Sequence, residues 1–396
     1  MKKISIIILK KFVYFLSLVI PKNKKIIIFG SRDGLIFGDN SRYLFIYCNE
    51  KILSYKFIWL TKNPEVFSYL NQIGFKCYFS NSLSGIFYSL ISNWHIFSYT
   101  ENDISDCFDY NVNKINLWHG FGLKKFEENK IKKKITFFKR KFYCVYLNRL
   151  YSKNFLKYLS SDTSNLIVSN FPRNDILKSS DKSLLKKYRT SQENNFINKI
   201  RNNKYNIGYF PTYRKSGIDL IVKEDDKKFI NIINENLIKN NSHVYFRSHI
   251  GLTLTKNSKY FNKELEKPKK YLLSQKRFSY LQNELDLTSI LNEMDILISD
   301  YSGVIIDYLI LNRPIILYIP DIKIYEKNTG LIIDYKKIDF AYFAHSFYEI
   351  SNLLNNYYKD PIKFSNFHAT NRKKALDLFI ENKECFKFIV DKFQKL

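Results

Sequence analysis

The sequence predicts an α/β protein built from two doubly wound, Rossmann-like domains that face each other across a cleft. Three observations support this fold class. Apolar runs of strand length alternate with segments of helix length, and this alternation starts twice, near residues 24 and 206. The chain of 396 residues is long enough for about two hydrophobic cores. Several apolar runs end in polar clusters, and parallel sheets of this class bind ligands at those strand ends.

The first domain is expected over residues 23–190. Its predicted strands are short runs rich in β-branched and aromatic residues, at 24–30, 56–61, 75–80, 94–99 and 115–118. Helical patterns occupy 41–52 and 83–91. A segment rich in Lys and Arg runs from Lys124 to Lys141, and we expect it to continue as a helical stretch to Leu159. The Asn- and Lys-rich stretch 191–204 is the best linker candidate.

The second domain is expected over residues 205–370. Its predicted strands lie at 206–210, 243–247, 271–273, 295–298, 315–319 and 331–333. Residues 371–396 stand apart from the alternation. We expect them to form one C-terminal helix, because a single helical pattern runs from Asn371 to Phe393.

The net charge of +27 predicts an anionic partner, which could be a membrane surface, a polyphosphate-like substrate or nucleic acid. Within residues 1–22, the stretch from Ile4 to Ile20 is apolar but is interrupted by Lys10 and Lys11, so a transmembrane helix is not expected. A signal peptide is not expected either, because no small-residue cleavage site follows. We predict a helix lying on the membrane surface, with a helix packed on the first domain as the alternative.

The five cysteines are scattered, odd in number and without CxxC spacing. We expect reduced, buried thiols in a cytoplasmic protein, with no disulfide framework and no zinc site. No other cluster of residues predicts a dedicated metal site.

The most informative stretch is residues 294–318, which predicts a strand, a tight turn, a helix and a second strand. The turn contains Asp300 and Ser302 and ends at Gly303. Ser302 can cap the following helix, and Gly303 would let a phosphate approach the backbone closely. Asp307 lies in the helix. The alternative for this stretch is a surface turn with an ordinary helix cap.

Further polar residues follow the other predicted strands. His119, which can accept a proton near neutral pH, is followed by Lys124, which can hold phosphate. The alternative is a core histidine beside a basic surface helix. Arg suits bidentate phosphate binding, and arginines occupy comparable positions in three more clusters. These are Thr212 with Arg214, Arg247 with His249, and Arg173 in a turn where we expect it to pair with Asp175.

Together these clusters give the chain a family resemblance. It resembles the CDP-glycerol glycerophosphotransferases, which build teichoic acids and related capsule polymers. The matching pieces are Trp118-His119-Gly120 with Lys124, Pro172-Arg173-Asn174-Asp175, Pro211-Thr212-Tyr213-Arg214, Arg247-Ser248-His249, and Ser299-Asp300-Tyr301-Ser302 through Asp307-Tyr308 to Pro314. Asp39-Asn40-Ser41 and the stretch from Asp321 to Gly330 match more loosely. The chain departs from the family pattern at Asn170, Ile250 and Gly303.

The resemblance implies a glycosyltransferase-B-like fold on the cytoplasmic face of the cell membrane, with the site in the cleft between the domains. It implies attack of an acceptor hydroxyl on the β-phosphate of a CDP-alcohol, giving a phosphodiester and CMP. The acceptor would be a lipid-linked glycan or polymer. His119 and His249 would be the catalytic residues; we expect His119 to be the base. The substrate-binding set would comprise Lys124, Arg173, Thr212, Arg214, Arg247, Asp300, Ser302, Gly303 and Asp307.

Within that set, Arg214, Ser302 and the Gly303 amide are expected to bind the diphosphate, and Arg247 with His249 to stabilise the reacting phosphate. No cofactor is expected, although a loosely held Mg²⁺ on the diphosphate stays open. A glycosyltransferase using a nucleotide-sugar is the alternative function, because it would share this architecture. A nucleic-acid-binding protein would account for the charge but not for the ordered motifs at strand ends, so no nucleic-acid partner is expected.

Overall fold

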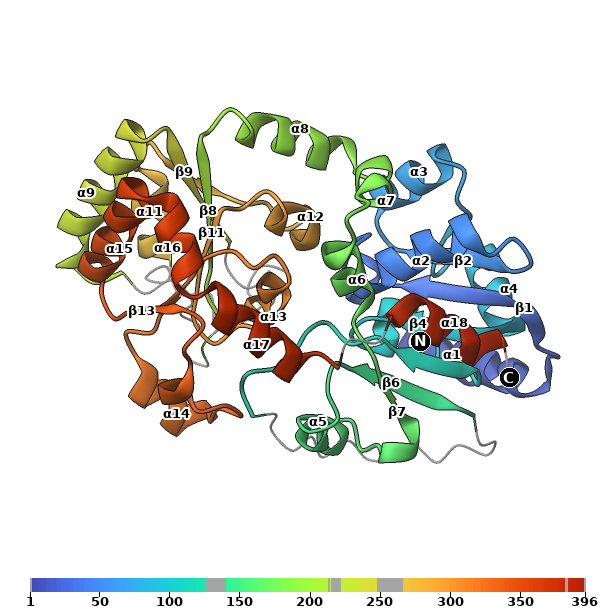
Figure 1. The fold of residues 1–396 in the computed structure, drawn as a ribbon. Coiled ribbons are helices and arrows are strands. Elements are labelled where there is room, and N and C mark those ends of the chain that lie inside the picture. Colours follow the sequence, from blue (N-terminus) through green and yellow to red (C-terminus); the bar gives the residue numbers. More distant parts are fainter. Residues whose placement is uncertain are drawn as a thin grey trace. The chain divides into compact units, whose positions relative to one another are not determined.

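The computed structural model describes residues 2–125, 140–212, 214, 222–247, 266–381 and 384–394. The chain divides into two compact units (Figure 1). Unit 1 comprises Met1–His119, Glu127–Thr190 and Ile380–Leu396, and unit 2 comprises Gly120–Phe126 and Ser191–Phe379. Each unit contains one parallel sheet with helices packed on it, which confirms the predicted α/β, doubly wound class.

Unit 1 has, within the described residues, a seven-stranded parallel sheet in the order β3-β2-β1-β4-β5-β6-β7. Its strands are β1 (Asn23–Gly30), β2 (Lys56–Thr61), β3 (Cys77–Phe79), β4 (Ser92–Phe97), β5 (Asn113–Asn116), β6 (Phe142–Tyr146) and β7 (Leu166–Val168). The strand order changes direction between β1 and β4. Such a switch point opens a crevice at the carboxyl ends of the strands, where ligands bind.

Two helices of unit 1, α3 and α4, begin at residues whose side chains cap them. The Asn63 side chain accepts a hydrogen bond from Glu65 N at the start of α3, and Ser82 caps α4 in the same way. The unit contains α1 (Lys2–Val19), α2 (Asp39–Lys51), α3 (Pro64–Gln72), α4 (Leu83–Ile91), α5 (Ser152–Tyr158), α6 (Pro172–Lys178), α7 (Ser183–Lys187) and α18 (Cys385–Gln394). Short 3-10 turns are η1 (Arg32–Gly34), η2 (Glu101–Asp103) and η3 (Thr163–Asn165).

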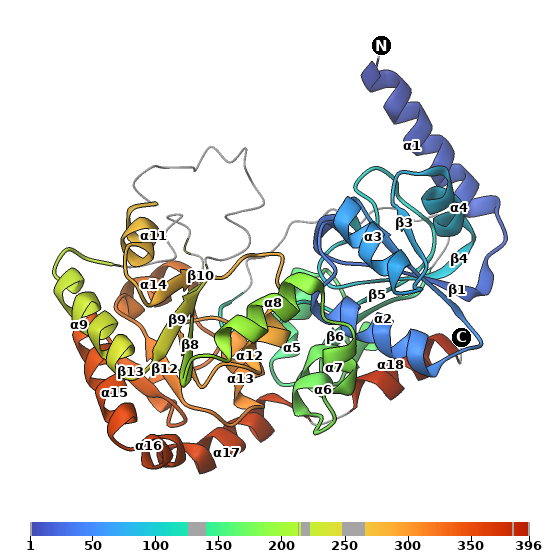
Figure 2. The same ribbon diagram turned by 90° about the horizontal axis from the view of Figure 1, so that it is seen from above.

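Helix α1 packs beside α4, and its N-terminal half extends past it (Figure 2). Val13 of α1 lies in a small buried cluster with Leu90 and Tyr110. Ser17 Oγ accepts a hydrogen bond from Asn111 N at 2.9 Å, and Lys22 Nζ donates to Leu90 O at 2.5 Å. In the part of the chain that the structure describes, no helix combines the length and the apolar character needed to cross a bilayer.

Unit 2 has, among the described residues, a six-stranded parallel sheet in the order β10-β9-β8-β11-β12-β13. Its strands are β8 (Tyr205–Phe210), β9 (Ser242–Phe246), β10 (Phe278–Tyr280), β11 (Ile296–Ser299), β12 (Ile315–Tyr318) and β13 (Tyr342–Ala344). Its switch point lies between β8 and β11.

The helices of unit 2 cover both faces of this sheet (Figure 1). They are α8 (Ser191–Ile200), α9 (Asp226–Lys239), α11 (Glu266–Leu273), α12 (Leu287–Leu291), α13 (Val304–Leu309), α14 (Ile322–Thr329), α15 (Phe347–Lys359), α16 (Pro361–Phe367) and α17 (Ala369–Phe379), with the 3-10 turn η5 (Tyr335–Lys337). Alternate strand residues, such as Ile296 and Ile298 of β11, join a core cluster with Ile233 of α9 and Leu354 of α15.

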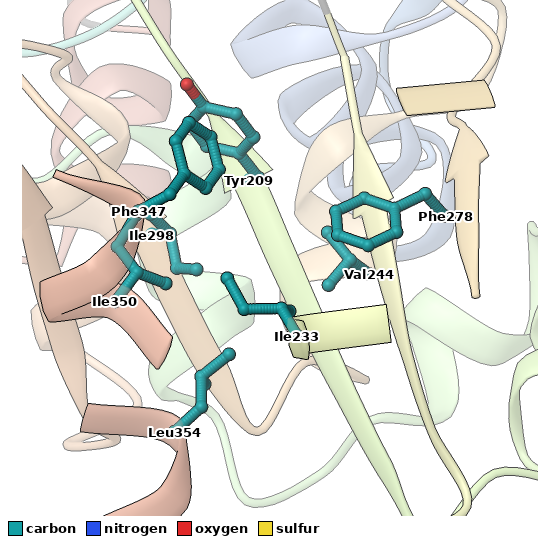
Figure 3. A pocket seen from close by; sticks show the side chains of 8 residues that line it. All are labelled: Tyr209, Ile233, Val244, Phe278, Ile298, Phe347, Ile350 and Leu354. Carbon is teal, nitrogen blue, oxygen red and sulfur yellow. The ribbon is translucent and has the colours of Figure 1, made fainter. Parts of the chain in front are cut away.

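A small cavity lies inside this core (Figure 3). Its lining consists of Tyr209, Ile233, Val244, Phe278, Ile298, Phe347, Ile350 and Leu354. Its volume is about 10 Å³, whereas roughly 10–15 Å³ is needed to hold one water molecule. The cavity is therefore a packing gap in the core and not a substrate site.

Four predictions of local structure are wrong. The stretch to Leu159 is not one helix, because Phe142–Tyr146 forms β6 between β5 and β7. Residues 271–273 end helix α11, and the strand lies later, at β10. Residues 331–333 form no strand; Leu331 makes an isolated antiparallel bridge with Lys124, and β13 follows at 342–344. Residues 371–394 form two helices, α17 and α18. The stretch 191–204 largely forms helix α8.

Candidate active site

The histidine predicted to be catalytic follows strand β5 of unit 1. The backbone turns sharply there: Trp118 has φ +56°, a left-handed conformation that is costly for a residue with a Cβ. Asn116 Oδ1 accepts a hydrogen bond from Trp118 N at 2.8 Å. The half-buried His119 ring meets the edge of Tyr99, with ring centroids 4.7 Å apart. His119 therefore lies at the rim of the sheet and is not the fully buried core histidine of the alternative interpretation.

An ion pair between distant segments fixes the backbone at His119. Arg173 Nη1 donates to Asp39 Oδ1 at 2.7 Å and to the His119 carbonyl oxygen at 2.9 Å. The neighbouring Asn40 donates through Nδ2 to the Trp118 carbonyl at 2.7 Å. Both side chains of the pair are nearly fully buried, at 9% and 5% exposure. Arg173 and Asn40 therefore each hold one carbonyl of the turn, those of His119 and Trp118 respectively.

The predicted pair of Arg173 with Asp175 is wrong. Asp175 instead accepts hydrogen bonds from Asn170 Nδ2 at 2.8 Å and from Cys385 N at 2.7 Å. It thereby anchors the start of α18 to α6. Residues two apart in a helix do not face each other, which explains why Arg173 and Asp175 find different partners.

Strained backbone is concentrated around this ion pair. Arg32 Nη2 donates to Asp39 Oδ2 at 2.7 Å, so Asp39 is held by two arginines. Arg32, Asp33, Asp39 and Trp118 all have positive φ angles, between 48° and 61°. Such conformations persist only where surrounding contacts enforce them, and they cluster at functional sites. Asp39 matched the family only loosely in sequence, and Arg32 carried no signal.

The segment directly after His119 belongs to unit 2 and is fixed there at two points. The Cβ position of Gly303 would lie 2.2 Å from the Phe121 carbonyl oxygen, so only glycine allows the two backbones to be this close. Ile332 N donates to Leu123 O at 2.9 Å. The half-buried Lys124 pairs with Leu331 in the isolated bridge. The Cβ side of Gly303 is therefore filled by the backbone of Phe121.

At the switch point of unit 2, Asp300 connects the ends of two neighbouring strands. Its Oδ1 accepts hydrogen bonds from Thr212 N at 2.8 Å, after β8, and from Tyr301 N at 2.6 Å, after β11. Its Oδ2 lies 3.0 Å from Arg214 Nη2. The structure therefore brings the predicted residues Thr212, Arg214 and Asp300 together. The Thr212 hydroxyl is buried as well, beside Asp300.

Arg214 is held by carboxylates on two sides. Its Nε donates to Asp321 Oδ2 at 2.6 Å and its Nη2 to Asp321 Oδ1 at 3.0 Å, in addition to the contact with Asp300. Burial lowers the pKa of the guanidinium, but the hydrogen bonds and charge of Asp321, together with Asp300, outweigh burial and raise it. Arg214 is therefore permanently charged, and its contacts with Asp300 and Asp321 form part of the framework of the site.

Three tyrosines that the sequence analysis did not assign to the site surround this framework. The rings of Tyr301 and Tyr325 stack with centroids 3.8 Å apart, and the Arg214 guanidinium lies 5.6 and 5.7 Å from them. The Tyr301 hydroxyl donates to Asp321 Oδ1 at 3.0 Å. The Tyr335 hydroxyl donates to the Asp300 carbonyl at 2.8 Å. Burial raises the pKa of the Tyr301 hydroxyl, and the nearby carboxylates raise it further, so this hydroxyl remains a proton donor.

The remaining predicted residues are placed as follows. Ser302 Oγ accepts a long hydrogen bond of 3.4 Å from Val304 N, while Gly303 occupies the cap position of α13. Arg247 follows β9 and donates through Nη1 to Leu285 O at 2.9 Å. Asp307 is buried within α13. His249 lies outside the described residues.

The described parts of the chain contain no cluster of side chains suited to bind a metal ion. No group of three or more His, Cys, Asp or Glu side chains there is arranged to hold a metal ion. The five cysteines are free thiols, and four of them are buried.

Comparisons with known proteins identify relatives. A teichoic acid poly(glycerol phosphate) polymerase from Bacillus spizizenii is 27% identical over 349 residues, covering 81% of this chain and 80% of that protein. A polymerase of the same name from Staphylococcus epidermidis is 25% identical over 332 residues, covering 78% of this chain and 42% of that protein. A solved structure of the wall teichoic acid polymerase TagF matches with a TM-score of 0.68 at 18% identity, over 100% of this chain and 95% of that chain.

The likeness to TagF extends over the whole chain and shows a shared fold. The family model described as CDP-Glycerol:Poly(glycerophosphate) glycerophosphotransferase matches residues 12–383, which include every predicted site residue. This protein therefore belongs to the CDP-glycerol:poly(glycerophosphate) glycerophosphotransferase family, as the ordered motifs at its strand ends predicted.

Proposed function

We propose that this protein transfers glycerol phosphate from CDP-glycerol to a hydroxyl group of a glycerol phosphate polymer or its glycan primer, in teichoic acid or capsule synthesis. The family match over residues 12–383 carries this proposal. The relatives are named as poly(glycerol phosphate) polymerases, and TagF has also been solved after soaking with CDPG. The acceptor oxygen forms a bond to the β-phosphorus, the bond from that phosphorus to the oxygen of CMP breaks, and the hydroxyl proton passes to a base.

His119 is our candidate for that base. Histidine titrates near neutral pH, and this ring lies at a strand end of unit 1 where it is only partly buried. The bond from Arg173 to the His119 carbonyl and the edge contact with Tyr99 fix its position. A fixed base needs little reorganisation when it takes the proton, which lowers the barrier.

The donor's diphosphate is assigned to unit 2. The buried Thr212 hydroxyl and the Ser302 hydroxyl are our candidates for contacts with the phosphate oxygens, and Arg247 with His249 for stabilising charge on the phosphorus being attacked. Lys124 would add a positive charge on the neighbouring segment. The contacts of Arg214 with Asp300 and Asp321 support a positioning role for it, while a direct contact with the diphosphate remains a prediction.

The function is tested by product analysis. The purified protein is incubated with an oligomeric glycerol phosphate acceptor and with CDP-glycerol, CDP-ribitol or UDP-glucose, and released nucleotides are quantified. We expect CMP from CDP-glycerol. His119→Ala should lower turnover by about 10²–10⁴-fold, the usual contribution of a general base. His345→Ala, at an exposed histidine that pairs with Glu349, is the matched control and should keep turnover.

Thermal melting of each variant separates lost chemistry from lost folding. Normal CMP release by His119→Ala would remove its role as the base. Release of UDP from UDP-glucose, without CMP from either CDP-alcohol, would establish the glycosyltransferase alternative instead.

We further propose that the acceptor is lipid-linked and that unit 1 binds the anionic face of the membrane. Helix α1 exposes an apolar stripe, formed by Ile8, Phe12, Phe15 and Val19 at helical spacing. The adjacent helix α4 exposes Leu83 and Phe87. Residues 1–25 contain seven lysines and no acidic residue, so the same region is attractive to anionic lipid. The predicted basic contact at Lys132, Lys133 and Lys134 lies outside the described residues.

Co-sedimentation with lipid vesicles tests the stripe. The wild type should bind anionic vesicles better than neutral ones, and less well in high salt, because salt screens the lysines. Phe12→Glu with Phe15→Glu should abolish binding at low salt. Phe367→Glu, at an exposed phenylalanine of unit 2, is the control and should bind normally. Binding that survives the double substitution would exclude α1 as the contact.

A further inference from the structure

The buried carboxylate of Asp103 joins the loops on both sides of the unit 1 switch point. Asp103 ends η2 and is fully buried. Its Oδ1 accepts a hydrogen bond from Asp33 N at 2.9 Å, in the loop after β1. Its Oδ2 accepts from Ser98 N at 3.1 Å and Tyr99 N at 2.8 Å, at the end of β4. One side chain therefore fixes three backbone amides from two loops.

The first of these connections leads directly to the His119 ring. Tyr99, whose amide bonds Asp103, contacts the His119 ring through its own ring at 4.7 Å. The Tyr99 carbonyl also accepts a hydrogen bond from Asn116 Nδ2 at 3.1 Å, and Asn116 Oδ1 accepts one from Trp118 N. A shift of the Tyr99 backbone would therefore move the Tyr99 ring, which contacts His119, and also Asn116, which supports the turn at Trp118.

The second connection leads to the His119 backbone. Asp33 adjoins Arg32, and both residues are held at positive φ. Arg32 donates to Asp39, which accepts in turn from Arg173, and Arg173 donates to the His119 carbonyl. The ring and the backbone of His119 are thus both connected to the same buried carboxylate.

We propose that ionised Asp103 is a positioning residue for His119 and that its protonation in mild acid releases the loops that hold the catalytic turn. This inference rests on the proposed role of His119 as the base. Asp103 itself is buried and contacts neither the reacting atoms nor solvent.

The surroundings of Asp103 raise its pKa, so that its carboxylate can take up a proton in mild acid. Burial raises its pKa to about 6, although the hydrogen bonds from Asp33 and Tyr99 and the charge of Arg32 lower it. The charged and titratable groups on the surrounding elements are Arg32, Asp33, Lys62 paired with Asp106, Tyr99, and Glu101 paired with Lys114. A protonated carboxyl presents a hydroxyl on one oxygen, and that oxygen accepts hydrogen bonds less well, so contacts to the loops weaken.

The way in which Asp103 makes the free energy of unfolding depend on pH distinguishes local release of the loops from unfolding of the whole unit. The pKa of Asp103 is about 6 in the folded state and about 3.9 in an unfolded chain. Its contribution to the free energy of unfolding is therefore largest below pH 3.9 and is lost as the pH rises through 6. Acidification through pH 6 therefore does not unfold the protein through this group. The expected effect is local, on the loops after β1 and β4.

The first test is the Asp103→Asn variant, assayed for CMP release from CDP-glycerol. Asn keeps the shape of the side chain but carries no charge and only one acceptor oxygen. We expect kcat at pH 8 to fall by about 10–100-fold, as for a displaced catalytic group, with KM for CDP-glycerol within twofold of wild type. Asp295→Asn is the control, because this half-buried carboxylate just before β11 in unit 2 also accepts a backbone amide, from Asn206; this variant should keep kcat.

The pH profile is the readout that a purely structural role would not change. In the wild type, both Asp103 and His119 must lose a proton for full activity, so log kcat should fall in acid with a slope steeper than one over the range in which both groups titrate. Asp103→Asn should fall with a slope of one. A slope steeper than one in the variant, or kcat within twofold of wild type, would overturn the proposal.

Amide hydrogen exchange distinguishes failure of this inference from failure of the proposed function. After correction for the intrinsic pH dependence, Asp33, Ser98 and Tyr99 should exchange at least about tenfold faster in Asp103→Asn than in wild type at pH 8. If His119→Ala remains active while these amides are released, the assignment of the base fails but the structural role of Asp103 stands. Unchanged exchange in the variant would refute the role of Asp103, whatever base the enzyme uses.

Discussion

Replacing Gly303 by alanine separates two explanations of this glycine. The sequence predicts that it allows a phosphate to approach, whereas in the structure its Cβ side faces the Phe121 carbonyl. A Cβ would lie 2.2 Å from that oxygen, and real Cβ atoms essentially never lie within 3.0 Å of such an atom. The obstacle is backbone and not the end of a flexible side chain, so the backbone around Phe121 must move away.

The cost of that movement follows from the packing. Overfilling a packed interior typically costs about 1–3 kcal/mol. For a unit of this size, each kcal/mol lowers the melting temperature by roughly 2–4 °C, which gives a loss of roughly 2–12 °C. Turnover should fall as well, because the displaced backbone lies between His119 and Lys124.

Calorimetry and CMP release on the same samples provide the assay. Gly74→Ala is the matched control: its φ of +85° makes alanine strained, but nothing lies within 4 Å of the added Cβ. The control should lose some stability and keep turnover. A Gly303→Ala variant with a wild-type melting temperature but weaker donor affinity would refute the packing explanation. It would support the explanation that Gly303 lets a phosphate approach the backbone.

Two further substitutions test the ion pairs at the strand ends. Arg173→Lys keeps the charge near Asp39 but cannot bond Asp39 and the His119 carbonyl with the same geometry; we expect turnover to fall about tenfold, measured as CMP release with KM unchanged. Arg214→Lys loses the bidentate contact with Asp321 while Asp300 stays buried; we expect about 1–3 kcal/mol loss of unfolding free energy in urea. Wild-type stability of the latter would show that its carboxylate partners find other donors.

The sequence predicted best where a motif and its contacts are local. The turn from Ser299 to Gly303 lies at the end of β11 as expected, and Thr212 and Arg214 meet Asp300 because β8 and β11 are neighbours at the switch point. The order of strands in a doubly wound sheet follows from its topology, so residues at strand ends could be placed on one edge without coordinates.

Contacts between distant segments could not be predicted in this way. The bonds from Arg173 to Asp39 and from Asp33 N to Asp103 join residues 134 and 70 positions apart, and no local pattern encodes them. Short apolar runs were also ambiguous. Leu272 is buried as part of a helix, although Tyr271-Leu272-Leu273 is equally typical of a buried strand.

The division of the chain into units has a consequence for synthesis on the ribosome. Unit 1 is completed by Ile380–Leu396, which is translated after all of unit 2. Helix α18 from this segment stacks Phe386 on Tyr47, with centroids 4.4 Å apart, and takes its anchor from Asp175. During synthesis, the surface around Tyr47 therefore stays without α18 while roughly 190 further residues are made, at about 5–20 residues per second. For roughly ten to forty seconds this surface stays uncovered, which makes it a site where the growing chain can aggregate.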